Sequence, residues 1–313
     1  MGNDIKSVQA KEMRTNSHIL KAGFTLIELS IVLVIIGLLV GGVLVGQDLI
    51  KAAEIRSQIQ QVEKYNSAVN TFRVKYNAIP GDIAEPNASG FGFKARGTQI
   101  GQGDGSGLLE GYDFGGNSSL FVNGETTMFW VDLSTAGLID GGFNTATATA
   151  TLSLTSSQIP LYFPRAKIGN GNYISVVSGA PMPLAWRSSN DLTSPYNYYI
   201  ISAMNAVVGV SQPSANNGIT VQQAYSIDSK IDDGFPQSGI ITAKYINTVS
   251  GSTWVYLSGT TILYDNTTPY TTATTASATT CFDNGNVNGA TQQYSISQNG
   301  GNGINCALMI RFQ

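Results

Sequence analysis

The N-terminal quarter of the chain combines a continuous apolar run with a longer amphipathic stretch. Residues 24–46 read FTLIELSIVLVIIGLLVGGVLVG, and no charge lies between Leu29 and Gly46. A helix of this length extends roughly 35 Å, and a bilayer core is about 30 Å thick, so the run predicts a membrane-crossing helix. Apolar residues then recur every three or four positions, which predicts that the helix continues with one apolar face. The positions are Ala52, Ile55, Ile59, Val62, Tyr65, Val69, Phe72 and Tyr76.

Beyond this helix the pattern changes to that of a β-rich domain. Pro80-Gly81 is a stop signal, so we expect one helix from Phe24 to about Asn77. Residues 81–120 are rich in glycine without a period and predict a long loop. Helical spacing predicts two short helices, Thr126–Ala136 and Ile219–Ile231. Runs of β-branched and aromatic residues predict strands at Tyr173–Val177, Tyr198–Ser202, Ala206–Val210, Ile240–Ile246, Trp254–Leu257, Ile262–Tyr264 and Ala307–Phe312.

Basic residues flank the apolar run on its N-terminal side. Lys6, Lys11, Arg14 and Lys21 outnumber Asp4 and Glu12 there. This bias predicts that the N-terminus stays in the cytoplasm and that the rest is translocated. A cleaved secretory signal is the first alternative, but its apolar region has 7–15 residues and a small-residue site after it. Here the run is longer, and the small residue Gly23 lies before it.

The junction at the start of the apolar run carries a specific resemblance. The octapeptide Lys21-Ala22-Gly23-Phe24-Thr25-Leu26-Ile27-Glu28 resembles the cleavage and methylation motif of type IV prepilins and type II secretion pseudopilins. The resemblance covers about residues 21–80. It implies that a prepilin peptidase cuts on the cytoplasmic side between Gly23 and Phe24, and that Phe24 is then N-methylated. It also implies assembly with other pilin subunits on an inner-membrane assembly platform, after a stage in membrane lipid.

The resemblance gives an α+β, pilin-like organisation in which the long N-terminal helix packs on a β-rich C-terminal globular domain. We expect a leader at residues 1–23, a transmembrane and filament-core helix at 24–46, an amphipathic helix at 47–79 and the domain at 80–313. The expected function is that of a major or minor pilin in a type IV pilus-like filament. The protein would lie in the bacterial inner membrane, crossing it once, before assembly and in the pilus, at the cell surface or in the periplasm afterwards. The alternatives are a type II secretion pseudopilin and a membrane-anchored surface binding protein.

Glu28 places a carboxylate beside the apolar run, and an acid at mid-bilayer costs about 2.5–3.5 kcal/mol. One interpretation is an interfacial acid stabilised by the helix dipole. The other, implied by the resemblance, is that Glu28 pairs with the Phe24 ammonium of a neighbouring subunit and so drives assembly. Four glycines at positions 37, 41, 42 and 46 form small-xxx-small pairs, which either allow close helix packing or reflect the frequency of glycine in membrane helices.

The amino-acid composition limits the ligands and reactions to be expected of this chain. The chain has 17 basic and 20 acidic residues, a net charge of −3 and a pI of about 5.2. A concentrated basic face is therefore not expected, nor is nucleic-acid binding. The single histidine, His18, lies in the expected leader, which excludes a Ser-His-Asp triad and a histidine-ligated zinc from the mature chain. We expect a structural protein and no enzyme.

A glycine-rich segment at residues 103–107, GDGSG, resembles half of a calcium loop. A full loop has acids at positions 1, 3 and 5 and a glutamate at position 12. Only Asp104 is acidic here, and Glu110 and Asp113 follow. The alternative is a plain glycine turn.

A second acidic group lies near the end of the expected helix at 219–231. Asp228 and Asp232 share one helical face, and Asp233 follows. Paired acids at this spacing suit a cation site or an acid with a raised pKa, and the alternative is a solvated turn. Neither acidic group has a nucleophile or partner base nearby that would make it an active site, so none is expected. We expect no cofactor, with calcium as the alternative.

Two cysteines, Cys281 and Cys306, lie on the expected translocated side, where oxidation is permitted. One intrachain disulfide is the simplest outcome, with two buried thiols or an intermolecular bridge as alternatives. The segment between them is rich in Asn and Gly and has few large apolar groups to pack. A disulfide would place the two Cα atoms about 4.4–6.8 Å apart.

Overall fold

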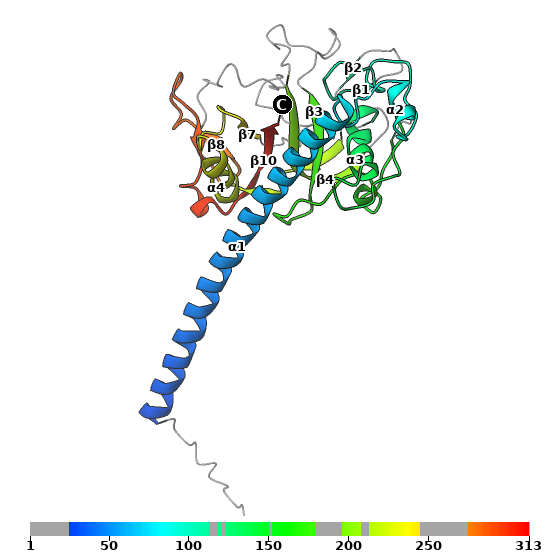
Figure 1. Cartoon of the computed structure of the whole chain (residues 1–313). Helices are drawn as coiled ribbons and strands as arrows, with labels where there is room; N and C mark the ends of the chain where they lie inside the picture. Colours follow the sequence, from blue (N-terminus) through cyan, green and yellow to red (C-terminus); the bar gives the residue numbers. More distant parts are fainter. Residues whose placement is uncertain are drawn as a thin grey trace, which may run out of the picture. The chain divides into compact units, whose positions relative to one another are not determined.

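The computed structural model describes residues 25–112, 118–119, 123–149, 152–178, 196–207, 213–244 and 275–312. The chain divides into two compact units, residues 1–49 and 50–313. Helix α1, Leu26–Tyr76, contains 51 residues; its beginning lies in the first unit and its remainder in the second (Figure 1). The expected long N-terminal helix is confirmed, and Phe24 lies outside the described residues.

Within the second unit, α1 buries the apolar face that the sequence predicted. Ile55, Val62, Tyr65, Val69 and Phe72 are buried. Gln58 and Ala68 are also buried, although neither belongs to the series of apolar residues from which the sequence predicted this face.

Two glutamines of α1 bind the segment that precedes the sheet. Gln58 accepts a hydrogen bond from the Ile168 amide at 3.2 Å. Gln61 accepts from the Lys167 amide at 3.0 Å and donates to the Arg165 carbonyl at 2.9 Å. These side chains satisfy the backbone of a loop, and so the helix face is partly polar where it meets that loop.

An antiparallel sheet forms the centre of the second unit. Its strands are β3 (Asn172–Ser178), β4 (Asn197–Val207), β5 (Pro213–Asn216), β6 (Ile219–Thr220), β7 (Ile241–Lys244) and β10 (Ile304–Arg311). The main order is β3-β4-β10-β6, with β5 paired to β4 and β7 paired to β10. The last strand of the chain therefore lies inside the sheet (Figure 1).

Smaller elements surround this sheet. Two hairpins are formed by β1 (Gly111–Tyr112) with β2 (Ser118–Ser119) and by β8 (Phe282–Asp283) with β9 (Gln293–Tyr294). The helices are α2 (Asn87–Gly90), α3 (Glu125–Thr135) and α4 (Val221–Ile231), with 3-10 turns η1 (Ile159–Leu161) and η4 (Asn299–Gly301). Helix α3 contacts β3, whereas α4 contacts β6, β7, β9 and β10. The fold is α+β, as the sequence predicted.

Aromatic side chains join these layers in one core. Tyr65 of α1 meets Trp130 of α3 edge-on, with ring centroids 5.0 Å apart. Tyr199 of β4 stacks on Phe312, the residue after β10, at 4.1 Å. Phe129 of α3 contacts both Tyr199 and Phe312. Such pairs contribute about 0.5–1.5 kcal/mol each beyond their buried area.

Several predicted elements differ in their bounds. Predicted strands at Tyr198–Ser202 and from Ala206 are one strand, β4, and residues 208–210 lie outside the described part. The helix expected from Ile219 begins at Val221, because Ile219 and Thr220 pair with β10. The strand expected from Ala307 begins at Ile304. The strands expected at Trp254–Leu257 and Ile262–Tyr264 lie outside the described residues.

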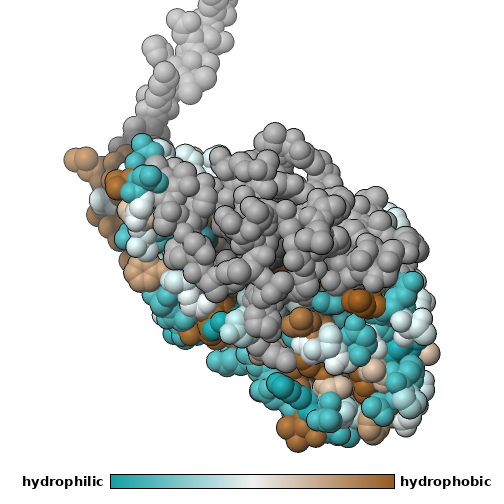
Figure 2. All heavy atoms as spheres, turned by 90° about the horizontal axis from the view of Figure 1, so that it is seen from above, coloured by the Kyte–Doolittle hydropathy of each residue, from teal (hydrophilic) through white to brown (hydrophobic). Residues whose placement is uncertain are grey.

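The exposed apolar side chains of the second unit are scattered. Figure 2 shows single hydrophobic residues among hydrophilic ones on the face that it presents. The exposed large apolar residues of this unit include Val74, Phe91, Leu161, Phe235 and Val287. Single exposed apolar residues of this kind are ordinary on a protein surface.

Candidate functional site

The first turn of α1 contains a reciprocal cap between Thr25 and Glu28. The Thr25 amide and hydroxyl both donate to Glu28 Oε2 at 2.8 Å. In return, the Glu28 amide donates to the Thr25 hydroxyl at 3.3 Å. This is a capping box, and it satisfies two of the amides that a helix start leaves without partners. Gly23 and Phe24, the expected cleavage and methylation residues, lie outside the described residues.

The first unit exposes an apolar helical surface. Sixteen large apolar side chains between Leu26 and Leu49 are 48% to 89% exposed. A Cβ added at any of the glycines 37, 41, 42 and 46 meets no atom within 4 Å. Among the described residues, α1 is the one helix long and apolar enough to cross a membrane, although a signal sequence at this position would pass the same test. The helix therefore offers a continuous surface for lipid or for other helices.

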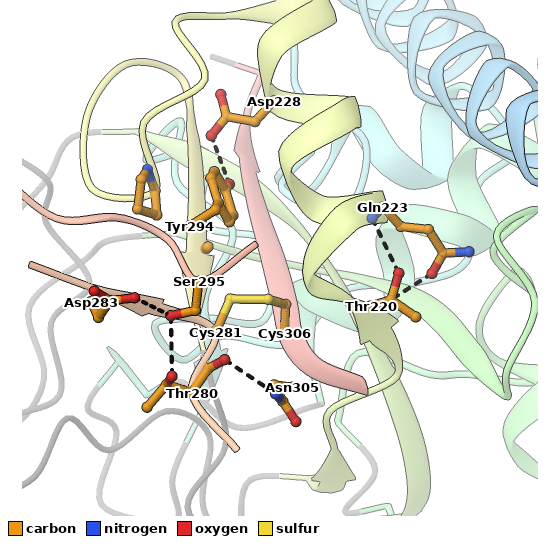
Figure 3. Close-up of a disulfide and its surroundings, with 12 residues drawn as sticks. Thr220, Gln223, Asp228, Thr280, Cys281, Asp283, Tyr294, Ser295, Asn305 and Cys306 are labelled. Carbon is orange, nitrogen blue, oxygen red and sulfur yellow. Dashed lines mark hydrogen bonds between the residues drawn. A yellow bond between two sulfur atoms is a disulfide. The ribbon is translucent and has the colours of Figure 1, made fainter. Parts of the chain in front are cut away.

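Cys281 and Cys306 form a disulfide with Cα atoms 5.1 Å apart, inside the expected range. Figure 3 shows that it joins the residue before β8 to strand β10. Both cysteines are buried. Asn305 reinforces the junction by donating to the carbonyls of Ala278 and Thr280 at 2.8 and 3.1 Å. The Asn- and Gly-rich segment between the cysteines is thus tied to the sheet at both ends.

The acidic group at the end of α4 builds a turn. Asp228 accepts from the Tyr294 hydroxyl at 2.7 Å (Figure 3). It also accepts from the Gly234 amide at 3.1 Å. Asp233 accepts from the Phe235 amide and the Ser238 hydroxyl, and one Asp232 oxygen accepts from the amides of residues 240 and 241. Oxygens of the three acids lie within 4.8 Å of one another. These donors account for the group as a structural turn.

Burial dominates the ionisation of Asp228. It raises the pKa of the carboxyl to about 7, although the Tyr294 and Gly234 hydrogen bonds oppose the shift. The nearby charges of Asp233 and Asp232 raise the pKa further. Burial also raises the pKa of Tyr294 well above its ordinary value. Asp228 and Tyr294 therefore share one buried hydrogen bond.

Asp104 belongs to a group of acids that the sequence did not bring together. One oxygen each of Asp82, Asp104 and Glu125 lies within 4.8 Å of the other two. Asp82 follows the end of α1, and Glu125 begins α3. Glu110 adjoins them through its amide, which donates to Glu125 Oε2 at 2.9 Å. Asp113, considered with Asp104 from the sequence, lies outside the described residues.

Backbone amides of the glycine-rich loop hold two of these acids. Asp82 accepts from the Gly105 and Gly107 amides at 2.7 and 2.6 Å. Glu125 accepts from the Gly103 amide at 2.8 Å. Gly105 and Gly107 have φ values of +77° and +87°, a backbone conformation that side chains disfavour. The glycines are thus needed so that successive amides reach the carboxylates.

The same group carries raised pKa values. Burial raises the pKa of Asp82 to about 7 against the Gly107 and Gly105 hydrogen bonds. Burial, together with the charges of Asp104 and Asp82, raises the pKa of Glu110 to about 7. Burial also raises the pKa of Glu125 well above its ordinary value. Four carboxyls close together disfavour the charged state of one another.

Sequence reasoning missed three residues of these sites. Thr25 had a local signal, since Thr-x-x-Glu at a helix start is a capping-box pattern. Asp82 and Glu125 had none, because they meet only when the loop folds between α1 and α3.

These features define a class of protein: an α+β chain with an exposed apolar N-terminal helix ahead of a disulfide-bonded β-rich domain. Residues 20–44 match the family model described as the prokaryotic N-terminal methylation motif. This is the prepilin-type cleavage motif of type IV pilins and pseudopilins, and the match covers the start of the chain alone. No curated protein and no solved structure matches the chain.

Proposed function

We propose that this chain is a structural subunit of a type IV pilus-like filament, a major or minor pilin. The observation that carries the proposal is the coincidence of the methylation motif at residues 20–44 with the capped start of an exposed apolar helix. A prepilin peptidase would cut between Gly23 and Phe24 and methylate Phe24. Proteins with this motif are typically structural, which supports a non-enzymatic role.

The exposed apolar surface of the first unit supports a stage in the membrane followed by a stage in a filament. Burying one large aliphatic side chain contributes roughly 1.5–3 kcal/mol, and sixteen such side chains are exposed here. Membrane lipid would cover them before assembly, and the helices of other subunits would cover them afterwards. An inner-membrane assembly platform would move the subunit from membrane lipid into the filament.

Glu28 has a defined place in this proposal. The carboxylate accepts only from Thr25 among the described residues, so it retains capacity for another donor. The methylated ammonium of Phe24 from a neighbouring subunit would supply that donor and a positive charge. A buried pair of this kind sets the axial register between subunits, because each charge is costly without the other.

The runner-up is a type II secretion pseudopilin, which would share the motif and helix. The large part of the chain beyond the helix favours a pilin. A membrane-anchored surface binding protein is the third candidate, but a simple anchor requires neither the glycine at the cleavage position nor a glutamate four residues after the new N-terminus.

The first experiment tests processing. The full chain is produced together with a prepilin peptidase in bacterial membranes, and its N-terminus is sequenced. We expect N-methylphenylalanine 24 and a mature net charge of −5, because the leader carries +2. Gly23→Leu should leave the precursor uncut, since a Cβ is excluded from a narrow protease site, whereas Ala22→Ser should be cut. An N-terminus at Met1, or after residue 46, overturns the proposal.

The second experiment locates the mature chain. Filaments are sheared from the surface of the native host and analysed by mass spectrometry. Abundant protein identifies a major pilin and trace amounts a minor pilin. Mature protein found only in the periplasm favours the pseudopilin alternative.

A further inference from the structure

The segment at residues 143–149, which follows α3 in the chain, has side chains that alternate between the inside and the outside of the domain. Ala146 and Ala148 are buried against α3, whereas Thr145 and Thr147 are exposed. A repeat of two residues is that of a β-strand. The segment nevertheless pairs with no strand in the part of the chain that the structure describes.

The carbonyl groups of this segment show the same repeat. The Lys94 ammonium donates to the carbonyls of Asn144 and Ala146, to the second at 2.9 Å. In extended backbone the amide and carbonyl of one residue point to one edge, and those of the next residue point to the other edge. Lys94 therefore occupies one edge of the segment, and the amides and carbonyls of Thr145 and Thr147 face the opposite edge.

This opposite edge is unpaired. Among the described residues, the amides and carbonyls of Thr145 and Thr147 take part in no hydrogen bond. An unpaired edge is a template for pairing with another chain, and proteins commonly block such an edge with lysine or proline. Residues 141–159 contain no charged residue and no proline. The sequence thus lacks the residues that would block this edge.

The unpaired edge is complementary to itself. Residues 145–151 read TATATAT, the same in both directions. In an antiparallel pair of two copies, Thr145 of one copy can lie opposite Thr147 of the other, with Ala146 opposite itself. Each opposed pair of threonines exchanges two backbone hydrogen bonds, so all four free groups of each copy gain a partner. A two-fold contact requires this kind of self-complementarity.

We propose that the edge at Thr145 and Thr147 pairs antiparallel with the same edge of a second copy of this chain. Threonines opposite each other across two strands are a favourable pair, and no like charges are opposed because the segment is uncharged. Few residues take part, so the dimer is weak and reversible. The contact is closed, so it joins two chains and builds no filament by itself. It therefore goes beyond the filament role proposed above.

The test uses the full chain in detergent, with more than one micelle per chain so that the apolar helices do not share a micelle. Analytical ultracentrifugation measures the number of chains per particle, and hydrogen–deuterium exchange measures the protection of backbone amides. Raising the concentration from micromolar to millimolar should convert monomers to dimers. It should also slow exchange at the amides of Thr145 and Thr147, and leave exchange in the exposed loop at residues 285–289 unchanged.

Charged substitutions test the pairing directly, because both threonine side chains are exposed in the single chain. Thr145→Lys/Thr147→Lys places like charges opposite each other and should raise the dissociation constant of the dimer at least about tenfold, with Tm unchanged. Thr145→Glu/Thr147→Glu should behave alike. An equimolar mixture of the two variants should form dimers again, since each lysine then meets a glutamate. The matched control Ser156→Lys/Ser297→Lys adds the same charge at other exposed positions and should dimerise like the unmodified chain.

Three results overturn the proposal: an unmodified chain that stays monomeric at millimolar concentration, unmodified affinity in Thr145→Lys/Thr147→Lys, or concentration-dependent protection that omits residues 143–149. A mixture of the lysine and glutamate variants that stays monomeric also overturns it, because pairing at this edge brings the opposite charges together. Filaments play no part in these measurements, so the filament role can fail while this contact stands, and the reverse.

Discussion

Thr25 and Glu28 bind each other in both directions at the start of α1. Two Thr25 donors reach one Glu28 oxygen at 2.8 Å, and the Glu28 amide returns a bond to the Thr25 hydroxyl. Glu28 thus has a local task in the single chain besides the intersubunit task proposed for it. Substitutions can separate the two tasks, because a cap needs an acceptor, whereas pairing with an ammonium needs a charge.

Glu28→Gln keeps an acceptor for the cap and loses the charge. We expect leader cleavage to be unchanged and sheared filaments to be strongly reduced, because the Phe24 ammonium would be buried without its counter-charge at a cost of about 3–5 kcal/mol. Thr25→Ala keeps the charge, weakens the cap by about 1 kcal/mol, and should still assemble. Normal filaments from Glu28→Gln together with poor filaments from Thr25→Ala would show that the cap alone matters.

The Cys281–Cys306 bond should stabilise the β-rich domain. Closing a loop of this length contributes about 3–4 kcal/mol in the chain-entropy account. Cys281→Ser should lower the free energy of unfolding by about that amount, measured with urea on the full chain in detergent, without affecting leader cleavage.

The matched controls for this bond are Cys306→Ser and the double variant. All three should be equally destabilised, since each removes the same covalent link. Two free thiols titrated in the denatured, unreduced chain would refute the bond itself.

The ion pair between Arg96 and Asp132 is fully buried on both sides. Asp132 also accepts from the Gly81 amide at 2.7 Å, so the pair ties the chain after α1 to α3. Arg96→Met should destabilise by about 3–5 kcal/mol, because it leaves a buried carboxylate without its cation. The double variant Arg96→Met/Asp132→Asn should lose much less than the sum of the single losses.

The exposed pair between Lys64 and Asp140 is the control for this cycle. Lys64→Met should change the urea midpoint little, because solvent already screens an exposed pair. Additive losses at Arg96 and Asp132 would mean that the two side chains act independently.

Asp228 should make the domain less stable as the pH rises. The pKa of its carboxyl is about 7 in the folded chain and about 3.9 when unfolded, so the folded chain binds the proton more tightly. That stability is complete below about pH 4 and is lost as the pH rises through about 7. Asp82 and Glu110 shift in the same direction, so the effect must be measured as a difference.

The measurement compares the unmodified chain with Asp228→Asn in EDTA by thermal unfolding between about pH 4.5 and 7.5. The unmodified chain should lose more Tm over this interval, since asparagine does not titrate. Parallel curves for the two proteins would contradict the raised pKa.

Periodic patterns predicted the helices better than the strands. The spacing of Tyr65 and Phe72 marked the buried face of α1, because a helix repeats its contacts every three to four residues. Strand β4 was expected as two strands because Ala203, Met204 and Asn205 lack β-branched or aromatic character. Pairing with β3 and β5 overrides that local preference, and the register with β5 shifts between Met204 and Ala206.

The start of α4 and the acidic loop show two kinds of missed information. Thr220 and Gln223 form a capping box, so a local signal for a start at Val221 was present. The loop at residues 81–120 had no such signal, because its order depends on Asp82 and Glu125. Contacts between residues so distant in the sequence produce no periodic sequence pattern. For that reason the glycine-rich segment was predicted only as a loop.

Strand β10 has a consequence for how the domain is made. A ribosome produces the chain from its N-terminus, so β10 emerges after the other strands of the sheet. Among the described residues β6 and β7 pair only with β10, and Phe312 covers Tyr199. Strands β3 and β4 can pair early, but β6 and β7 must wait with open edges until β10 has been made. A stop codon ahead of residue 304 would therefore leave a nascent protein that cannot close its sheet, and unpaired edges of this kind expose a chain to aggregation and proteolysis.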